Sequence, residues 1–196
     1  MSTFNVSLVG VGGQGILLTA NLLGRVAALA GLDVKKSEIH GMAQRGGSVT
    51  SQVRFGEKVS SPIIQEGTAD ILVSFDKVES LRNQGILASG GRAIVNDLYL
   101  VPVTVSSGQQ KNPEDLDKEV AKAFGKKLFL VNASKIAAEE VGNTRTMNMV
   151  LAGALSKFCP IEEDIWFEAM AQILSGPKAK LLEINKKAFE LGRKAV

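Results

Sequence analysis

The stretch Phe4-Asn5-Val6-Ser7-Leu8-Val9-Gly10-Val11-Gly12-Gly13-Gln14-Gly15 decides the fold of this chain. An apolar, strand-like run enters a glycine-rich turn, and the turn opens a helical stretch from Ile16 to Ala30. Gly10 and Gly12 let the backbone turn and approach a ligand, and Gly15 lets the helix pack on the strand. The helix N-terminus then offers amides to an anion. We expect a cofactor-binding or site-closing loop made of Gly10, Gly12, Gly13, Gln14 and Gly15; the alternative is a turn that only joins strand to helix.

A second glycine-rich segment, Ser37-Glu38-Ile39-His40-Gly41-Met42-Ala43-Gln44-Arg45-Gly46-Gly47-Ser48, lies between two apolar stretches and holds the only histidine of the chain. Arg45 supplies a permanent cation whose planar fork of donors suits a carboxylate or a phosphate. The alternative is a strained turn in which Gln44 and Arg45 satisfy nearby carbonyls. As candidate site residues in this segment we take His40, Gln44, Arg45, Gly46 and Gly47.

Short apolar runs alternate with helical patterns, which predicts an α/β fold: a Rossmann-like, three-layer, mainly parallel sheet with helices on both faces. The run from Gly47 to Gly56 alternates apolar and polar residues, so it should have one wet face and is a candidate for antiparallel pairing. A polar loop over Ser106 to Pro113 should precede a helix from Glu114 to Phe124. The expected strands are Phe4 to Val9, Asp33 to Ile39, Ser48 to Phe55, Ile71 to Phe75, Arg92 to Asn96 and Leu128 to Val131.

From Ser134 onward the pattern is helical, so the last third should cover one side or edge of the sheet. Ser175-Gly176-Pro177 is typical of a helix start, and the apolar face that follows comprises Leu181, Ile184, Ala188, Leu191 and Ala195. The helix from Met147 to Leu155 is apolar on nearly all sides and must be buried. It is buried either in the chain's own core or against another subunit, with Arg145 and Asn148 as polar contacts. Residues 1–196 are most simply one domain.

The composition is that of an ordinary globular domain, with 45% hydrophobic and 22% charged residues. The net charge of +3 does not gather into a basic block with aromatic residues, so we expect no nucleic-acid partner. The single cysteine, Cys159, excludes an internal disulfide framework. We also expect no signal peptide, no membrane span and a cytoplasmic location. A metal site at His40 is not expected, since there is no second histidine.

The two glycine-rich motifs, followed by Ser61-Pro62-Ile63-Ile64-Gln65-Glu66-Gly67-Thr68-Ala69-Asp70, resemble the gamma-type subunits of 2-oxoacid:ferredoxin oxidoreductases. The form His40-Gly41-Met42-Ala43-Gln44-Arg45-Gly46-Gly47-Ser48 is similar to that of the indolepyruvate branch. The resemblance extends over essentially the whole chain, including Arg145 to Leu155 and Ala188 to Gly192.

This resemblance implies a non-redox subunit of an enzyme that oxidatively decarboxylates a 2-oxoacid to an acyl-CoA and reduces ferredoxin. A lone cysteine cannot ligate an iron–sulfur cluster, and the acidic motif of a thiamine diphosphate site is missing. Thiamine diphosphate, Mg and the [4Fe-4S] clusters are therefore expected on a larger partner subunit. Coenzyme A is expected at the interface, ferredoxin as a partner through the complex, and homodimer contacts are a further option.

Two other classes stay open at this point. An independent NAD(P)-binding dehydrogenase would need an acidic residue at the end of the second strand for the ribose hydroxyls; Glu38 lies near that place, but no hydride-transfer constellation is visible. An adenylate-forming Rossmann-type protein has a similar glycine loop, but the chain shows neither a nucleophilic cysteine near a loop nor paired cysteines for zinc. Three questions stay open at this point: which 2-oxoacid is used, whether the glycine loop binds a nucleotide or coenzyme A at all, and the stoichiometry of the complex.

Overall fold

The structure, a computed structural model, describes residues 2–41, 46–109, 111 and 115–196. Within these residues one six-stranded sheet has the order β2-β3-β1-β4-β5-β6. The strands are β1 (Phe4–Val11), β2 (Asp33–His40), β3 (Ser48–Gly56), β4 (Ala69–Ser74), β5 (Leu87–Asn96) and β6 (Leu128–Val131). The α-helices are α1 (Ile16–Leu29), α2 (Lys77–Arg82), α3 (Val103–Ser106), α4 (Leu116–Phe124), α5 (Ala133–Lys135), α6 (Met147–Ser156), α7 (Glu163–Ile173) and α8 (Leu182–Lys194). Short helical turns are η1 (Gln84–Ile86), η2 (Gly125–Lys127), η3 (Ile136–Val141), η4 (Thr144–Thr146) and η5 (Gly176–Leu181).

The prediction of a mainly parallel sheet is confirmed only in part. Strands β1, β4, β5 and β6 pair in parallel, whereas β3 runs antiparallel to both β1 and β2. The connection between β2 and β3 covers only residues 41–47, which is too short for the crossover of a dozen or more residues that parallel neighbours require. The wet face predicted for β3 is present, because Ser51 and Val53 are buried while Gln52 and Arg54 are partly exposed.

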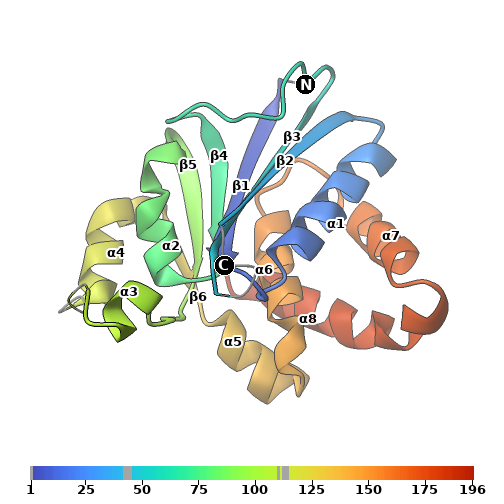
Figure 1. Cartoon of the computed structure of the whole chain (residues 1–196). Coiled ribbons are helices and arrows are strands. Elements are labelled where there is room, and N and C mark those ends of the chain that lie inside the picture. Colours follow the sequence, from blue (N-terminus) through green and yellow to red (C-terminus); the bar gives the residue numbers. More distant parts are fainter. Residues whose placement is uncertain (1, 42–45, 110, 112–114) are drawn as a thin grey trace.

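Helices cover both faces of the sheet, which confirms the three-layer α/β architecture (Figure 1). Helices α1, α6, α7 and α8 enclose the larger core on one face, and α2 and α4 enclose a smaller core on the other. Helix α1 ends in a left-handed glycine, Gly31, whose amide donates to the carbonyl of Ala28 at 3.1 Å. The Leu32 amide donates to Ala27 at 3.0 Å, and this pair of bonds is a Schellman motif.

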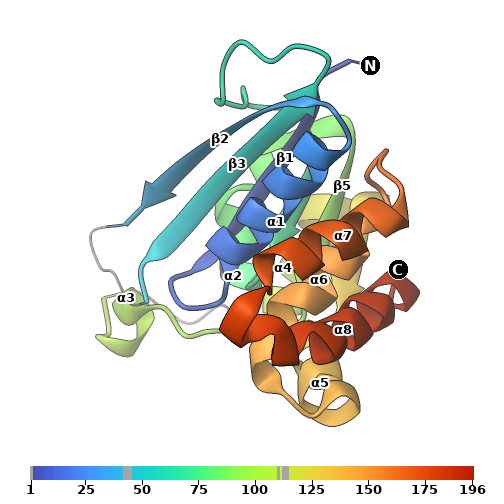
Figure 2. The same cartoon turned by 90° about the vertical axis from the view of Figure 1, so that its right-hand side faces the viewer.

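Helix α6 lies between the sheet and α8, as Figure 1 and the view turned by 90° in Figure 2 both show. A Cβ added to Gly153 would lie 1.9 Å from the carbonyl oxygen of Phe189, and one added to Gly192 would lie 1.9 Å from that of Val150. The two helices therefore touch backbone to backbone. Every residue from Asn148 to Ser156 is buried within the chain itself, so the alternative that this helix is buried against another subunit is wrong.

The buried face of α8 and the start of α4 differ from the prediction. The buried face of α8 is centred on Ala188, Phe189 and Gly192, because the close contact with α6 requires the glycine at 192. Leu181 and Ala195, which belong to the predicted face, are exposed. Helix α4 begins at Leu116, where the Asp115 side chain accepts from the Lys118 amide at 3.0 Å and caps it; Glu114, the predicted start, lies outside the described residues. Residues 110, 112 and 113 of the predicted loop from Ser106 to Pro113 lie outside the described residues.

Candidate functional site

The candidate site lies at the edge of the sheet where the parallel strands end. The chain leaves β1 through Gly10–Gly15 and enters α1 on one face, and it leaves β4 at Phe75 and enters α2 on the other face (Figure 1). Neighbouring strands whose connections depart to opposite faces define a switch point, the place where ligands of open α/β sheets bind. The first predicted motif therefore stands at the expected ligand-binding edge.

Gln14 fills the crevice at this switch point. Its Oε1 accepts from the Val11 amide at 2.7 Å, and its Nε2 donates to the Phe75 carbonyl at 3.2 Å, so the side chain joins the loop to β4. A Cβ on Gly10 would lie 2.6 Å from Gln14 Oε1 and 2.8 Å from Phe75 Cβ. Gly10 was expected to let a ligand approach; in the structure it makes room for Gln14 instead.

Gly13 and Gly15 shape the entry to α1. Both have a positive φ, +103° and +89°, which favours glycine. Gly15 was expected to let α1 pack on its strand, but the space beside it is occupied by Asn148 of α6, whose Nδ2 would lie 2.8 Å from an added Cβ. No side chain caps α1, so its first amides face the sheet edge without a side-chain acceptor.

A hollow of about 370 Å³ opens beside this helix N-terminus. Asn148 is 5% exposed; its Oδ1 accepts from the Met149 amide at 3.0 Å, and its Nδ2 has no hydrogen-bond partner among the described residues. Arg145 is exposed at the rim and forms no ion pair within the described part of the chain. An unpaired amide donor, a cation and a helix N-terminus together favour an anion. The lining comprises Gly13, Gln14, Gly15, Leu98, Leu100, Thr144, Arg145, Met147 and Asn148.

A second hollow, also of about 370 Å³, lies on the other side of the same loop and is mainly apolar. His40 reaches it from the end of β2, with half of its side chain exposed and its Nε2 3.6 Å from Glu38 Oε2. The lining comprises Gly12, Gly13, Gly15, Ile16, Leu17, Leu18, His40 and Val49. The glycine loop thus separates two hollows of similar size. The first is called the polar hollow below because the polar side chains Gln14, Thr144, Arg145 and Asn148 line it, whereas His40 lines the second.

The two glycine-rich segments, Gly10 to Gly15 and Ser37 to Ser48, contact each other through their described residues, as expected if they form one site. The Gly12 amide donates to the Gly47 carbonyl at 2.9 Å, and the Gly41 amide donates to Ser48 at 2.8 Å. Gly46 has a φ of +76°, a conformation that favours glycine. Gln44 and Arg45, the two polar residues on which the second motif depends, lie outside the described residues.

A buried charged group beside this junction was missed from the sequence. Glu79 is 2% exposed; its Oε2 accepts from Ser48 Oγ at 2.6 Å, and its Oε1 pairs with Arg82 at 2.6 Å. Asp76 caps α2 by accepting from the Val78 and Glu79 amides, and burial raises the pKa of its carboxyl. The spacing Asp-x-x-Glu directly after a buried strand is a capping signal that could have found both residues.

Metal and nucleophile chemistry find little support in the described residues. These residues contain no group of three or more His, Cys, Asp or Glu side chains that could hold a metal ion. Burial raises the pKa of the Cys159 thiol, which makes a thiolate nucleophile unfavourable there. Nor does any described helix combine the length and apolar character that a membrane crossing requires.

The strand order also disfavours the dehydrogenase alternative. In a dinucleotide-binding fold, the acid that binds the ribose ends the strand next to β1. Here β3 separates β2 from β1, and Glu38 is engaged by Lys36, whose Nζ lies 2.6 Å from Glu38 Oε1. The hydrogen bond from Lys36 lowers the pKa of Glu38. The Glu38 carboxylate therefore pairs with a lysine of its own edge strand and is not at the position that binds a ribose beside the glycine loop.

Comparison with known proteins agrees with the resemblance drawn from the sequence. The family described as pyruvate ferredoxin/flavodoxin oxidoreductase matches residues 5–195, and the chain belongs to this family. It is 44% identical over 200 residues to the indolepyruvate oxidoreductase subunit IorB of Thermococcus kodakarensis, covering 100% of this chain and 96% of the relative. The resemblance to gamma-type subunits, including the indolepyruvate branch, is thereby confirmed.

Two solved structures share the fold. The gamma subunit of a keto/oxoacid ferredoxin oxidoreductase from Geobacter sulfurreducens matches with a TM-score of 0.71 and 21% identity, over 98% of this chain and 97% of that chain. A 2-oxoglutarate:ferredoxin oxidoreductase from Magnetococcus marinus, with 2-oxoglutarate, coenzyme A and succinyl-CoA bound, matches with a TM-score of 0.74 and 22% identity. It covers 100% of this chain but only 31% of that chain, so there the same fold forms part of a longer polypeptide.

Proposed function

We propose that this chain is the non-redox small subunit of a 2-oxoacid:ferredoxin oxidoreductase of the indolepyruvate or arylpyruvate type. The observation that carries the proposal is the 44% identity, over the full length of the chain, to the indolepyruvate oxidoreductase subunit of Thermococcus kodakarensis. The assembled complex would decarboxylate the 2-oxoacid oxidatively, form the acyl-CoA and reduce ferredoxin. Residues 1–196 would act as one unit, in the cytoplasm, where the single cysteine stays reduced.

The redox chemistry belongs to a larger partner in this proposal. Thiamine diphosphate, Mg and the [4Fe-4S] clusters would be held there, because a single cysteine cannot ligate a cluster. In the Magnetococcus enzyme the matched fold occupies only 31% of its chain, so there the fold is joined to a larger polypeptide, as a small subunit joined to a larger partner would be. Contacts with the partner would include the segment Ser61 to Ile64, where Ile63 is 51% exposed.

The contribution of this chain would be to hold an anionic part of coenzyme A at the polar hollow. The first amides of α1, Asn148 Nδ2 and Arg145 supply donors and positive charge there, and Gly13 leaves open space for a close approach. His40, which lines the second hollow, would help to close the active site together with Gln44, Arg45, Gly46 and Gly47. These groups orient the coenzyme and exclude water, and they move no electron.

Reconstitution tests this function. The purified chain alone should reduce no viologen dye, and the chain coexpressed with a thiamine-dependent iron–sulfur subunit should reduce it with indolepyruvate and coenzyme A. Indolepyruvate should be preferred over pyruvate and 2-oxoglutarate, which serve as matched substrates. A complex that turns over pyruvate as well as indolepyruvate would contradict the substrate class, and a partner that is fully active without this chain would contradict the subunit role.

The coenzyme A site is tested separately by Arg145→Gln in that complex. Losing one charge-assisted bond, worth about 1.5–3 kcal/mol, should raise the KM for coenzyme A about 10- to 100-fold and leave the KM for the 2-oxoacid unchanged. The control is Arg25→Gln, which removes an exposed arginine of α1 that bonds to Gln172, away from both hollows. An unchanged KM for coenzyme A in Arg145→Gln would refute this assignment.

A further inference from the structure

Strand β2 is a long, open edge of the sheet. It has 8 residues, whereas β6 at the opposite edge has 4, and short edge strands are one way in which proteins avoid unwanted pairing. Among the described residues, the backbone groups of Val34 to His40 bond only to β3. No described helix or loop runs along the outer side of β2 (Figure 2).

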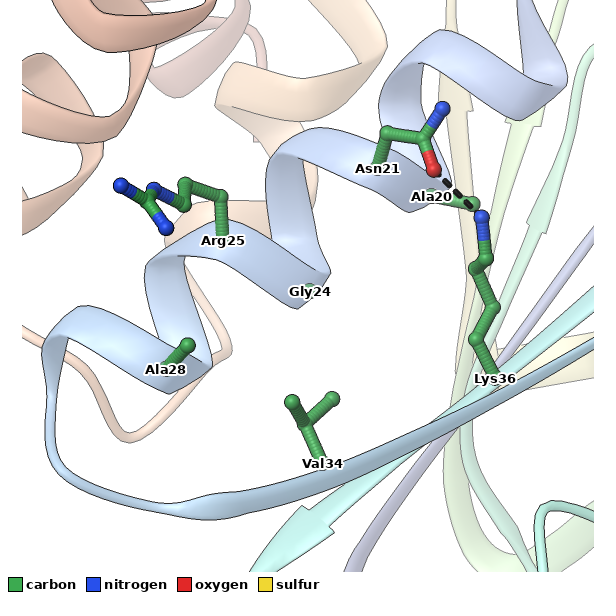
Figure 3. A pocket seen from close by; sticks show the side chains of 7 residues that line it. All are labelled: Ala20, Asn21, Gly24, Arg25, Ala28, Val34 and Lys36. Carbon is green, nitrogen blue, oxygen red and sulfur yellow. Dashed lines mark hydrogen bonds between the residues drawn. The ribbon is translucent and has the colours of Figure 1, made fainter.

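Helix α1 covers the inner face of this strand only in part. A groove of about 320 Å³ separates them, and Lys36 of β2 reaches across it to hydrogen-bond Asn21 of α1 (Figure 3). The ammonium group of Lys36 is therefore fixed at the edge of the sheet by this hydrogen bond. On the same face, Glu38 pairs with it at 2.6 Å; the two side chains are 32% and 27% exposed.

Among the registers that pair at least five residues of β2, the charges select one for antiparallel pairing with an identical strand. Residues directly opposite one another in an antiparallel pair lie on the same face. When the two-fold axis passes through Ser37, Lys36 of each copy lies opposite Glu38 of the other, so two pairs of opposite charge form. When the axis passes through Lys35, Lys36 or Glu38, that residue meets its own like charge in the second copy.

The opposite face of the strand gains as well. Ile39 is 61% exposed, the highest value among the large hydrophobic residues found exposed in the described chain. In the Ser37 register it lies opposite Lys35 of the second copy, whose aliphatic stem can cover it. Apolar burial on one face and charge pairing on the other thus favour the same register.

We propose that two copies of this chain associate through β2, antiparallel and centred on Ser37, so that the two sheets become one continuous sheet. The interface is isologous, as expected for a dimer with two-fold symmetry. One strand edge is at the small end of stable interfaces, so the dissociation constant should be on the order of 10 µM. This inference does not rest on the proposed function, because the paired groups lie outside the two hollows that flank the glycine loop, His40 alone excepted.

Charge exchange tests the register. Sedimentation equilibrium of the purified full chain should show a reversible monomer–dimer equilibrium. Lys36→Glu places two glutamates opposite two others, and Glu38→Lys places two lysines opposite two others, so each variant alone should self-associate at least about tenfold more weakly. A mixture of the two variants restores both opposite-charge pairs, so it should form a heterodimer with nearly wild-type affinity.

Matched controls are Lys178→Glu and Glu190→Lys, which make the same charge changes at exposed positions away from β2 and should dimerise like the wild type. Circular dichroism confirms that each variant is folded. A wild-type chain that stays monomeric well above 10 µM would overturn the proposal. So would unchanged dimerisation of both single variants, or folded variants that fail to associate when mixed.

Discussion

Replacing Gly15 by alanine should cost much more stability than replacing Gly13, although both residues have a positive φ in the same loop. For an L-residue, a left-handed conformation costs roughly 1–2 kcal/mol. A Cβ on Gly13 meets nothing within 4 Å, so Gly13→Ala should lose only that amount. A Cβ on Gly15 would lie 2.8 Å from Asn148 Nδ2 and 3.0 Å from its Cβ and Cγ, and such overpacking adds roughly 1–3 kcal/mol. We therefore expect a loss of about 2–5 kcal/mol for Gly15→Ala.

Urea denaturation measures these free energies, and Asn148→Ala completes a double-mutant cycle with Gly15→Ala. Because Asn148→Ala removes the nearest atom, Nδ2, the two substitutions should couple favourably by about 1 kcal/mol. Asn148→Ala should not couple to Gly13→Ala, which is the control. Equal losses for the two glycine variants, together with additive cycles, would refute the conclusion that Asn148 is seated against Gly15 at the polar hollow.

Three further predictions address packing, pH and the second motif. Gly153→Ala should lower the free energy of unfolding, measured by urea denaturation, by about 3 kcal/mol or more, because the new Cβ would clash with the Phe189 carbonyl. The control Gly24→Ala, in the middle of α1 with nothing within 4 Å, should raise that free energy by about 0.5–1 kcal/mol. A mild effect at Gly153 would contradict the α6–α8 contact. Lys36 lowers the pKa of Glu38, so the stabilisation by ionised Glu38 should be complete above its unfolded value of 4.5 and lost as the pH falls through the lower folded value. The difference of up to about 1 kcal/mol between wild type and Glu38→Gln in the monomer should thus narrow as the pH falls below 4.5, and a constant gap would contradict it. In the complex, Arg45→Lys should lower turnover while melting temperature and assembly stay near wild type if Arg45 clamps an anion; a lower melting temperature with unchanged specific activity would make the segment a scaffold turn.

The first half of the fold could be predicted because its signals are local. The glycine loop predicted β1 and α1, and the alternation in β3 predicted its wet face and its antiparallel pairing. The position of β3 between β1 and β2 could not be read from the sequence, since strand order depends on contacts between distant segments. For the same reason the acid at Glu38 looked close to the ribose position when it is not.

Some residues of the candidate site could likewise be predicted from local sequence signals, and others could not. The sequence named the loop and His40, and the structure places them together. It named Arg145 and Asn148 only as contacts to another subunit, because nothing in a linear pattern shows that α6 returns to the N-terminus of α1. Gln14 shows the opposite case: it was predicted to bind a ligand, but its side chain hydrogen-bonds the backbone of Val11 in its own loop and of Phe75 after β4.

The measurement that tests the central claim most directly is the iron and thiamine diphosphate content of the material that co-purifies with a tagged copy of this chain, expressed at its native level. We predict that the chain is retained with a larger subunit, that iron and thiamine diphosphate are both present, and that both leave with the larger subunit when the complex is separated. The chain itself should then be colourless. A chain that purifies without a thiamine-dependent partner, or that keeps stoichiometric iron after separation, would contradict its assignment as the non-redox subunit.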